Sequence, residues 1–495
     1  MAEAYRTPAY CLPYELLMEI WKHIRDSGQL QNGVWVTSTF TVSQVCRWWR
    51  SAALSTPELW QEVRFSVPVR RAKATDMLRL HLERSGDLPL DIEGRLMCDW
   101  RPPHYSWLHT TREGTVFPED LMAALTKHAD RWRTLSIQVD GDFPPCSRMI
   151  MHLIDIHLSP LSRPLRTPRL RNVQIQCGEY GQMSFGRGIP QLSRLHLRSI
   201  LIDLDFTGPT LAHLTALDVG CLPPRLRFLH ADFRDILARA PNLARLCLTG
   251  PCLQGGSLDY TPIHMPALRE LAFNECASDE DEDGFMLELH HVISAPHLSC
   301  LTLSGLKYLA LCDFLRSLSG GVPSAAQKYP ALTRLRLRNV ETCDYSDQFT
   351  TLSTTSSDAT GLQIGRQFAS IKHLELENKS CLLLRQLGLL TGRYTADPPL
   401  PNLRTLSWLP YRAGDGLTIQ DFIARRTRLE VPLNSLQLQK SDHGRVEDYV
   451  AEWFRSHVQV DLVDDTKVLH SWQQVCTPWQ DSCTCDPTKV HKRRS

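Results

Sequence analysis

Several features that mark large classes of proteins are missing from this sequence of 495 residues. No uncharged apolar run approaches the roughly 18 residues needed to cross a membrane, because Lys307 and Asp313 interrupt the closest candidate. An acidic Glu3 and the lack of an apolar segment after it argue against a secretory signal. We therefore expect an intracellular protein, located in the cytoplasm, the nucleus or both, that does not bind membranes.

An excess of charge of one sign is also missing. The chain contains 55 Lys and Arg against 54 Asp and Glu, which gives a formal net charge of +1. This balance produces no overall field that would attract nucleic acid, so no nucleic-acid partner is expected. The 16 Cys are scattered and form no C-x-x-C pair, and Cys483 and Cys485 lack further ligands at matching spacing. We expect no metal site and no cofactor.

The common catalytic motifs are missing as well. The sequence has no G-x-S-x-G, no phosphate-binding glycine loop, no H-E-x-x-H and no G-x-G-x-x-G. We therefore expect that the chain is not an enzyme. The acidic run from Asp279 to Gly284 resembles the first half of a calcium loop. The twelfth position, however, is His290 where a calcium loop needs a bidentate Glu, which favours a solvent-exposed loop.

What the sequence does contain begins with an amphipathic helix near the N-terminus. In LPYELLMEIWKHI the apolar residues recur at a spacing that places them in one stripe of a helix. These residues are Leu12, Leu16, Leu17, Ile20, Trp21 and Ile24. Pro13 suits the first helical turn, and Glu15 complements its positive end.

A second helix is predicted from about Ser38 to Leu54. Its inner face would hold Val42, Val45, Cys46, Trp49 and Ala53. Pro57 then breaks the helix, and Leu59 and Trp60 turn back toward it. Two or three short helices cannot easily bury so many large side chains by themselves, and surplus apolar surface usually meets a partner.

The residues of this helical region resemble an F-box. The match covers about Leu12 to Trp60 and follows the pattern L-P-x-E-L-L, then V-C-x-x-W-R, then Pro-x-Leu-Trp. The insert RDSGQLQNGVWVTST between the helices departs from the pattern. The resemblance implies docking on the Skp-type adaptor of a cullin ubiquitin ligase. The matching adaptor-binding positions are Leu12, Pro13, Leu16, Ile20, Val42, Val45, Cys46, Trp49, Leu59 and Trp60. In the alternative interpretation, the same residues only form the core of the module.

One short pattern, L-x-x-L-x-L, recurs through the rest of the chain, often with Pro in front. It is typical of the strand half of a leucine-rich repeat, in which two inward residues flank an outward one. Successive copies begin 22 to 39 residues apart, which is irregular. The eleven copies begin at Trp132, Leu170, Leu192, Leu214, Leu243, Leu268, Leu298, Leu332, Ile371, Leu403 and Leu433. The segment ADFRDILARAPNL between two of them has the apolar face of a helix.

The predicted fold is an α/β repeat, a leucine-rich-repeat-like solenoid, with a small N-terminal all-α F-box-like domain. We expect the F-box-like domain at residues 8–65 and a linker or first irregular repeat at 66–125. The degenerate solenoid would follow at 126–460, with a partly disordered tail at 461–495. LRLHLERSGDLPLDI and HADRWRTLSIQV resemble the linker and first strand of fungal F-box proteins with degenerate leucine-rich repeats.

Two basic ladders are candidate target-binding sites on the outward side of the strands. The first consists of Arg334, Arg336 and Arg338, which could hold carboxylates or a phosphorylated segment. Parallel, in-register strands would instead place Arg336 beside Glu375 and Arg338 beside Glu377, and this internal pairing is the favoured use.

The second ladder consists of Arg194, His196 and Arg198. Apart from Asp218, the neighbouring repeats offer it no acidic residue. It is therefore the better candidate for a partner.

The function that this combination predicts is the substrate-recognition subunit of a Skp–cullin–F-box ubiquitin ligase. The N-terminal helices would bind the adaptor, and through it a cullin, while the repeats would bind a protein target. The chain would be a monomer within the hetero-complex, and Trp49→Ala would abolish adaptor binding. The alternative is a non-catalytic leucine-rich-repeat scaffold with no role in ubiquitin transfer.

Overall fold

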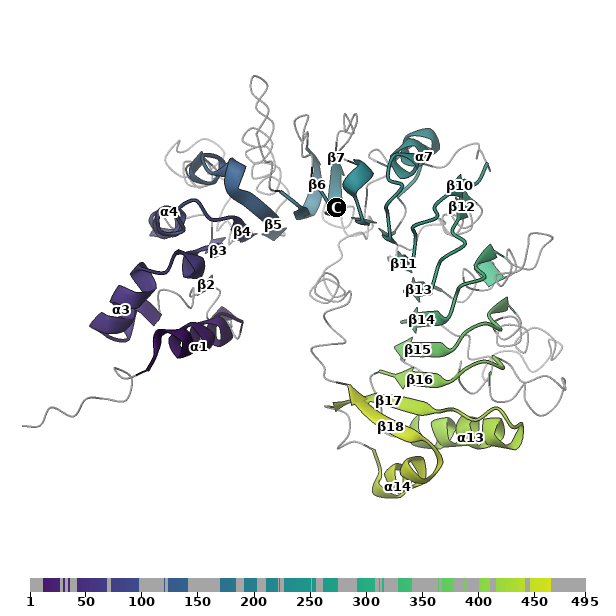
Figure 1. The fold of residues 1–495 in the computed structure, drawn as a ribbon. Helices are drawn as coiled ribbons and strands as arrows, with labels where there is room; N and C mark the ends of the chain where they lie inside the picture. The colour runs from purple at the N-terminus through teal and green to yellow at the C-terminus, as the bar shows by residue number, and fades with distance from the viewer. Residues whose placement is uncertain are drawn as a thin grey trace, which may run out of the picture. The chain divides into compact units, whose positions relative to one another are not determined.

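The computed structural model describes most of the expected repeat strands and the N-terminal helices (Figure 1). The described residues are 12–26, 30–31, 34–35, 42–68, 73–97, 120, 123–140, 170–183, 191–202, 211–220, 222, 227–250, 252–254, 261–274, 292–307, 311, 314–315, 328–340, 364, 367–377, 384, 387, 400–409, 415–440 and 446–463. They belong to two compact units, Met1–Thr215 and Ala216–Ser495.

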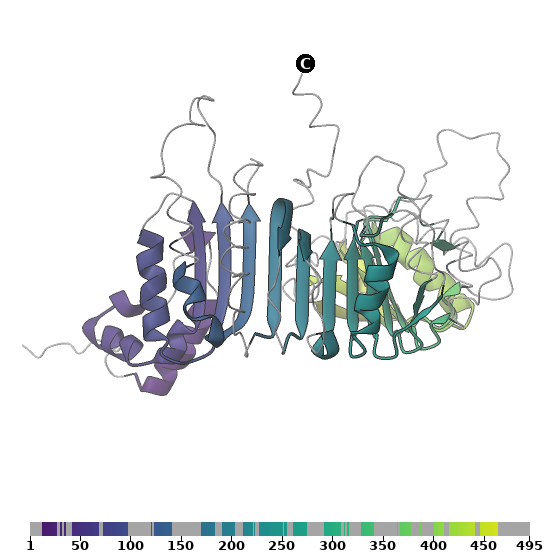
Figure 2. The ribbon, with the colours of Figure 1, turned by 90° about the horizontal axis from the view of Figure 1, so that it is seen from above.

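Five parallel strands form the sheet of the first unit, and Figure 2 shows them side by side and pointing in the same direction. In order, they are β3 (Glu62–Pro68), β4 (Leu90–Met97), β5 (Trp132–Asp140), β6 (Asn172–Met183) and β7 (Arg194–Ile202). Strands β5, β6 and β7 lie at predicted repeat positions. Strands β3 and β4 were not predicted.

Nine parallel strands form the sheet of the second unit, and all pair in register. In order, they are β8 (Ala216–Gly220), β9 (Arg245–Thr249), β11 (Glu270–Asn274), β13 (Cys300–Ser304), β14 (Arg334–Arg338), β15 (His373–Glu377), β16 (Thr405–Trp408), β17 (Ser435–Gln439) and β18 (Gln459–Val463). All but β18 lie at predicted repeat positions. Thus each of the eleven copies of the leucine pattern forms a strand of a parallel sheet.

The leucine pattern produces these strands because its apolar positions all point into the core. In β14, Leu335 and Leu337 are almost completely buried, and so is Leu332 in the turn before the strand. That turn is closed by a hydrogen bond from the Leu332 N–H to the Tyr329 carbonyl over 3.0 Å. Equivalent bonds close the turns before β15 and β16. A repeat with this turn therefore satisfies backbone groups at the turn while it adds one strand to the sheet.

The end of the strand follows a common geometry as well. Gly250, Gly305 and Asn339 directly follow β9, β13 and β14, and all three have a positive φ, between 46° and 72°. This left-handed conformation suits Gly and Asn best.

Among the described residues of the second unit, helices lie on one side of the sheet and none on the other, which we call the open side (Figure 1). The helical side holds α7 (His230–Ala238) and α13 (Asp415–Arg428), together with the short strands β10 (Ile263–His264) and β12 (Ile293–Ser294). The predicted apolar face of α7 is confirmed, because Phe233, Ile236 and Leu237 are buried. Helix α14 (Asp448–His457) packs against α13 and β18.

Helices dominate the N-terminal part of the first unit. They are α1 (Tyr14–Asp26), α3 (Arg47–Leu54), the 3-10 helix η2 (Pro57–Trp60) and α4 (Lys73–Arg84). A two-residue antiparallel pair, β1 (Leu30–Gln31) and β2 (Val34–Trp35), lies in the insert between α1 and α3. The sequence had predicted an entirely helical N-terminal region. The pair β1 and β2 shows that this region also contains strands.

The sheet of the first unit starts earlier than the leucine pattern indicated. The prediction that the strand at Trp132 is the first was wrong, because β3 and β4 precede it. Both show simple alternation, with Val63, Phe65, Leu90 and Ile92 buried. Strand β3 runs across the predicted boundary at residue 65, and β18 runs across the one at residue 460.

Several predictions fall outside the described residues. These are the acidic segment from Asp279 to His290, the pair Cys483 and Cys485, and the C-terminal tail after Val463. Among the helices that are described, none has the length and apolar character needed to cross a bilayer.

Candidate functional site

The N-terminal helices enclose a small core of their own. Leu17 and Trp21 of α1 pack with Val42, Trp49 and Ala53, and these five side chains are at most 8% exposed. The rings of Trp21 and Trp49 meet edge to face with centroids 5.9 Å apart, which is a favourable aromatic geometry. Trp49 is therefore a core residue of this module.

The ten predicted adaptor-binding residues fall into three groups by exposure. Val42, Trp49 and Trp60 are buried. Leu12, Ile20, Cys46 and Leu59 are half-buried and pack against the core. Pro13, Leu16 and Val45 are exposed, with Leu16 at 52% and Val45 at 56%. Only the second and third groups have surface to offer a partner.

The predicted helix from Ser38 to Leu54 was wrong, because the helix is interrupted at Val45 and Cys46. Cys46 has an extended backbone and its sulfur accepts a hydrogen bond from the Trp49 N–H over 3.4 Å, so α3 starts only at Arg47. This N-cap satisfies one of the unpaired N–H groups of the helix. It also changes the direction of the chain at Val45, which was predicted on the inner face and instead points into solvent.

Trp60 connects the N-terminal helices to α4. Its indole N–H donates to the Ala53 carbonyl over 2.8 Å, and its ring meets the ring of His81 edge to face at 4.9 Å. The Arg84 guanidinium lies 4.5 Å from the ring centroid. Burial lowers the pKa of His81 to about 4, against the opposing effect of a hydrogen bond with the Trp60 backbone. At neutral pH His81 is therefore an uncharged core residue.

A buried arginine that the sequence did not single out holds α4 to the start of β5. Arg131 donates to the carbonyls of Leu88 and Leu82 at 3.0 and 3.2 Å, and to the hydroxyl of Ser85. These acceptors lie in the last turn of α4 and the loop after it. Nothing in the spacing of the residues signals this contact, because it depends on the chain folding back over more than forty residues.

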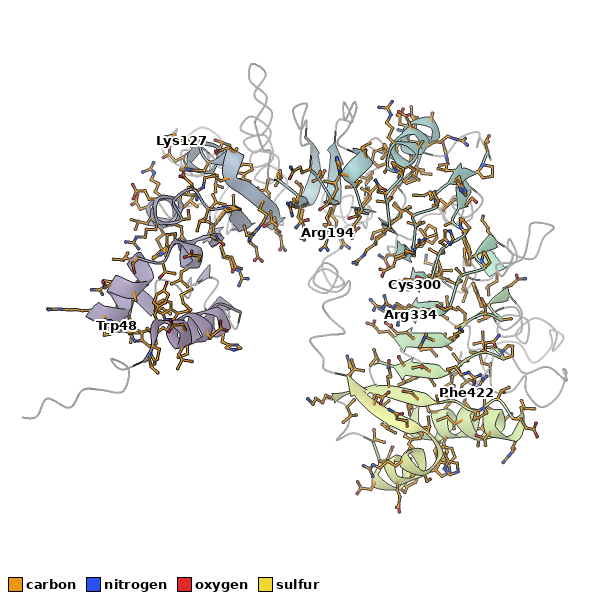
Figure 3. The ribbon with its side chains drawn as sticks, in the orientation of Figure 1. Trp48, Lys127, Arg194, Cys300, Arg334 and Phe422 are labelled. Atoms are coloured by element: carbon orange, nitrogen blue, oxygen red, sulfur yellow. The ribbon has the colours of Figure 1, made fainter. Side chains whose placement is uncertain are left out.

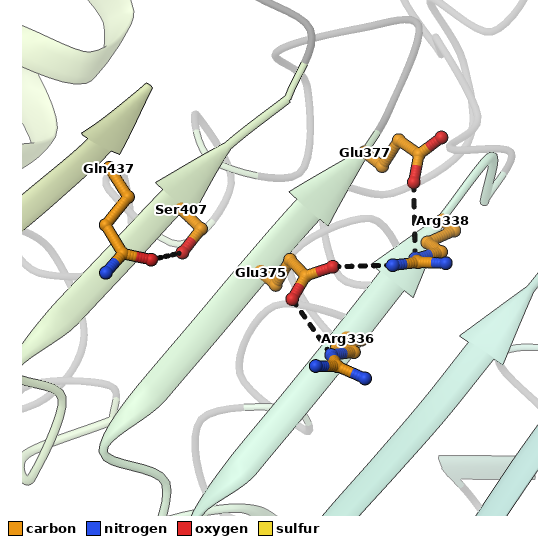
Figure 4. A network of polar contacts seen from close by, with 6 residues as sticks. All are labelled: Arg336, Arg338, Glu375, Glu377, Ser407 and Gln437. Carbon is orange, nitrogen blue, oxygen red and sulfur yellow. Dashed lines mark hydrogen bonds and ion pairs between the residues drawn. The ribbon is translucent and has the colours of Figure 1, made fainter. Parts of the chain in front are cut away.

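The first basic ladder forms an internal ion-pair network with the neighbouring strand (Figure 4). Arg336 donates to one oxygen of Glu375 at 2.9 Å, and Arg338 donates to the other at 2.8 Å. Arg338 also lies 3.2 Å from Glu377. The register pairs Arg336 with Glu375 and Arg338 with Glu377, which confirms the predicted internal pairing. We call these four residues the β14–β15 network.

The charges of this network are mutually stabilised and largely shielded from water. The four side chains are between 8% and 17% exposed. Burial raises the pKa of the Glu375 carboxyl, but attraction by Arg336 and Arg338 outweighs it and holds this pKa below its ordinary value. The network is therefore ionised, and these two arginines have protein carboxylates as partners. Arg334, the third member of the ladder, is exposed and lies beside Cys300 and His373 in the register.

On the side of β6, the second basic ladder has uncharged residues in register. Arg194, His196 and Arg198 of β7, which we call the β7 column, pair in register with Asn172, Gln174 and Gln176 of β6. Arg194 is exposed, His196 is half-buried and Arg198 is 7% exposed. Figure 3 shows Arg194 on the open side of the strands in the first unit.

Polar side chains cover the open side of several other strands. Ser407 donates to Gln437 at 2.7 Å, and Ser435 donates to Asp461. In the described parts of the chain, no three His, Cys, Asp or Glu side chains come together as a metal site requires. The open side thus offers hydrogen bonds and charges for recognition.

Compared with models of known protein families, and with curated proteins, the chain gives no match.

Proposed function

We propose that this chain is the substrate-recognition subunit of a Skp–cullin–F-box ubiquitin ligase. The N-terminal helices would bind the Skp-type adaptor, and through it a cullin, while the open side of the sheet would bind a protein target. The observation that supports this proposal most is apolar surface on a module whose core is already closed. Leu16 and Val45 belong to the F-box-like pattern and are both more than half exposed.

Two further exposed apolar residues lie on α1 and α3 and are candidates for the adaptor surface. Tyr14 at the start of α1 is 45% exposed, and Leu54 at the end of α3 is 43% exposed. The hydroxyls of Tyr14 and Thr56 are 2.6 Å apart, which links the start of α1 to the turn after α3. Scattered apolar residues on a surface are ordinary, but several of them on two linked short helices are typical of a binding site.

The arrangement of the strands supports a degenerate leucine-rich-repeat solenoid as the target-binding part. Parallel strands with buried leucines, a turn that recurs before several of the strands and helices on one side are all typical of that architecture. The proposed role needs no catalytic residue in this chain. Bound target lysines would be kept close to a ubiquitin-charged enzyme elsewhere in the complex, and proximity would raise the rate of transfer.

The test uses the exposed residues, because truncation of Trp49 would damage the core of the module instead of its surface. We expect the double variant Leu16→Asp/Val45→Asp of the full chain to lose most binding to a Skp-type adaptor, with a drop of roughly tenfold or more. The matched control is Leu417→Asp on α13, where an equally exposed leucine (58%) lies far along the chain. Affinity can be measured by biolayer interferometry with purified adaptor.

Equal adaptor binding by the double variant and the wild type would contradict the proposed docking surface. Retention of a cullin by the wild-type complex separates the ligase subunit from a scaffold that has no role in ubiquitin transfer. A wild-type chain that binds neither adaptor nor cullin would leave only the scaffold role.

A further inference from the structure

Four basic residues gather at the start of three neighbouring strands in the second unit. Arg334 is the first residue of β14 and His373 is the first residue of β15. Lys372 and Arg404 directly precede β15 and β16. Arg334, Lys372 and Arg404 are exposed, and His373 is half-buried. We call these four residues the basic cluster.

The pairing of consecutive repeats brings the basic cluster together. Arg334 and His373 are in register, and both precede a buried leucine, which places them on the open side. Figure 3 shows Arg334 on that side of β14. The backbone N–H of Arg404 donates to the Lys372 carbonyl over 2.8 Å, so these two residues have the same place in consecutive repeats. Neighbouring strands lie about 4.8 Å apart, so the cluster extends over roughly 10 Å.

No carboxylate neutralises the basic cluster in the part of the chain that the structure describes. None of its four side chains takes part in an ion pair or a hydrogen bond there. The register neighbours on β13 and β16 are Cys300 and Thr405, which carry no negative charge. The row continues on β11 with Glu270, which lies two strands from β14 and 3.8 Å from Arg245.

The positive charges of the cluster act on one another and on the groups beside them. Burial, with added repulsion from Arg334 and Lys372, holds the pKa of His373 below its ordinary value. Burial also lowers the pKa of Arg426 to about 10, and repulsion from Arg404 adds to this effect. An anion placed among these charges would remove that repulsion. The cluster is therefore suited to bind a negatively charged group.

The β14–β15 network indicates how much negative charge such a cluster can hold. There the single carboxylate of Glu375 is enough to bridge Arg336 and Arg338. The basic cluster has three exposed cations, so one carboxylate would leave positive charge without compensation. A phosphate monoester has a charge of about −1.5 to −2 at pH 7 and three strong acceptor oxygens. It therefore fits three cations better than a carboxylate does.

We propose that the basic cluster binds a phosphate monoester. Arg334, Lys372 and Arg404 would donate hydrogen bonds to its oxygens, and the two arginines suit this role because their planar groups offer several N–H donors at once. Two sources share this chemistry, a phosphorylated side chain of a target protein and a small phosphate compound. The inference goes beyond the proposed function, because the site lies on the repeats and needs no adaptor.

The test measures binding of a short labelled peptide to the full chain by fluorescence polarisation. The probe has one phosphoserine between neutral residues, and its matched controls have Ser or Glu at that position. We expect the phosphoserine peptide to bind roughly tenfold or more tightly than either control. The variant Lys372→Gln/Arg404→Gln should lose this preference.

Competition identifies the source of the phosphate. Displacement of the labelled peptide by far less unlabelled phosphoserine peptide than inorganic phosphate would support a phosphorylated side chain. Equal displacement by the two competitors would support a small phosphate compound. Both results keep the phosphate site, whereas equal binding of the phosphoserine, Ser and Glu peptides to the wild type would overturn it.

The matched control variant is Lys127→Gln/Arg171→Gln, which removes one exposed lysine and one exposed arginine from the first unit. It should bind the phosphoserine peptide as the wild type does, and equal losses in the two glutamine variants would also overturn the proposal. The variant Lys372→Arg/Arg404→Lys keeps the charges and should retain most binding. Thermal unfolding of each variant separates loss of charge from misfolding.

Adaptor binding by the same variants distinguishes this inference from the proposed function. Because the basic cluster lies in the second unit, Lys372→Gln/Arg404→Gln should bind the Skp-type adaptor as the wild type does. If the wild type binds the phosphoserine peptide but no adaptor, the ligase assignment fails while the phosphate site stands. If it binds the adaptor but shows no preference for the phosphoserine peptide, the phosphate site fails alone.

Discussion

Strands β7 and β14 differ far less in their own sequences than in the strands beside them. Both place Leu at the core positions and basic residues at the open positions. Beside β14, Glu375 and Glu377 neutralise the arginines, whereas β6 places Asn172, Gln174 and Gln176 beside the β7 column. The first arrangement gives Arg336 and Arg338 charged partners on the neighbouring strand, whereas β6 offers the β7 column neutral amides.

The comparison teaches that a basic ladder in a repeat protein cannot be interpreted from its own strand. In parallel, in-register sheets the neighbour on each side decides whether a charge is used internally. Inspection of consecutive repeats therefore shows which basic residues have an acidic neighbour in register, as Arg336 and Arg338 do.

The largest expected effect is the loss of the bridging carboxylate. Glu375→Gln removes the group that both Arg336 and Arg338 contact, and leaves two largely buried guanidinium groups with weaker acceptors. We expect the free energy of unfolding of the second unit to fall by about 3 kcal/mol. Urea denaturation, monitored by hydrogen exchange in the peptides that contain β14 and β15, measures this decrease in the free energy of unfolding. A decrease no larger than that of an exposed variant such as Glu452→Gln would show that the network contributes little.

Acid should affect the two units in different pH ranges. Burial lowers the pKa of His81 to about 4, from an ordinary 6.5. As the pH falls, the imidazole of His81 is therefore protonated in the unfolded chain at a higher pH than in the folded chain. The free energy of unfolding of the first unit should therefore decrease by about 2 kcal/mol between pH 7 and pH 5. The pKa of Glu375 lies below its ordinary 4.5, so its stabilising contribution is complete above that pH and is lost only below it.

Tryptophan fluorescence during urea unfolding at several pH values checks this difference. The variant His81→Gln should remove most of the change between pH 7 and pH 5. An unchanged pH dependence in that variant would mean that another group in the first unit is responsible.

The smallest expected effect comes from copying the β15 arrangement onto β6. Gln174→Glu places a carboxylate beside His196, in the register position that Glu375 has beside Arg336. We expect a gain in stability of about 0.5 kcal/mol, because the new carboxylate adds an opposite charge across the two strands. Thermal unfolding of the variant and of the wild type measures this effect. A lower melting temperature in the variant would show that this register position does not provide a stabilising pair.

Much of the repeat architecture follows from the sequence because its signal is local and repeated. One leucine pattern fixes which residues enter the core, and the turn before it repeats with the same hydrogen bond, as at Leu332 and Leu403. Strands β3, β4 and β18 lack that pattern. Their alternation of apolar and other residues is a weaker signal, because it is short and includes Gly94 or an exposed Leu462.

The N-terminal module was harder to predict in detail because helix periodicity does not show where a helix is interrupted. Because Cys46 caps α3, Val45 is exposed and not on the inner face as predicted, whereas Trp49 is buried. The contacts of Trp60 and Arg131 depend on α4 and β5 folding over the module. Such long-range contacts produce no regular residue spacing from which they could be predicted. The F-box-like pattern thus covers the N-terminal helices without separating their buried residues from their exposed ones.

The central claim is that the N-terminal helices carry a protein-binding surface that is separate from their own core. The most direct test measures the adaptor affinity of two variants of the full chain. We predict that Leu16→Asp/Val45→Asp loses the adaptor, whereas Leu417→Asp on α13, at an equally exposed leucine, keeps it. Equal adaptor affinity of the two variants would contradict the account.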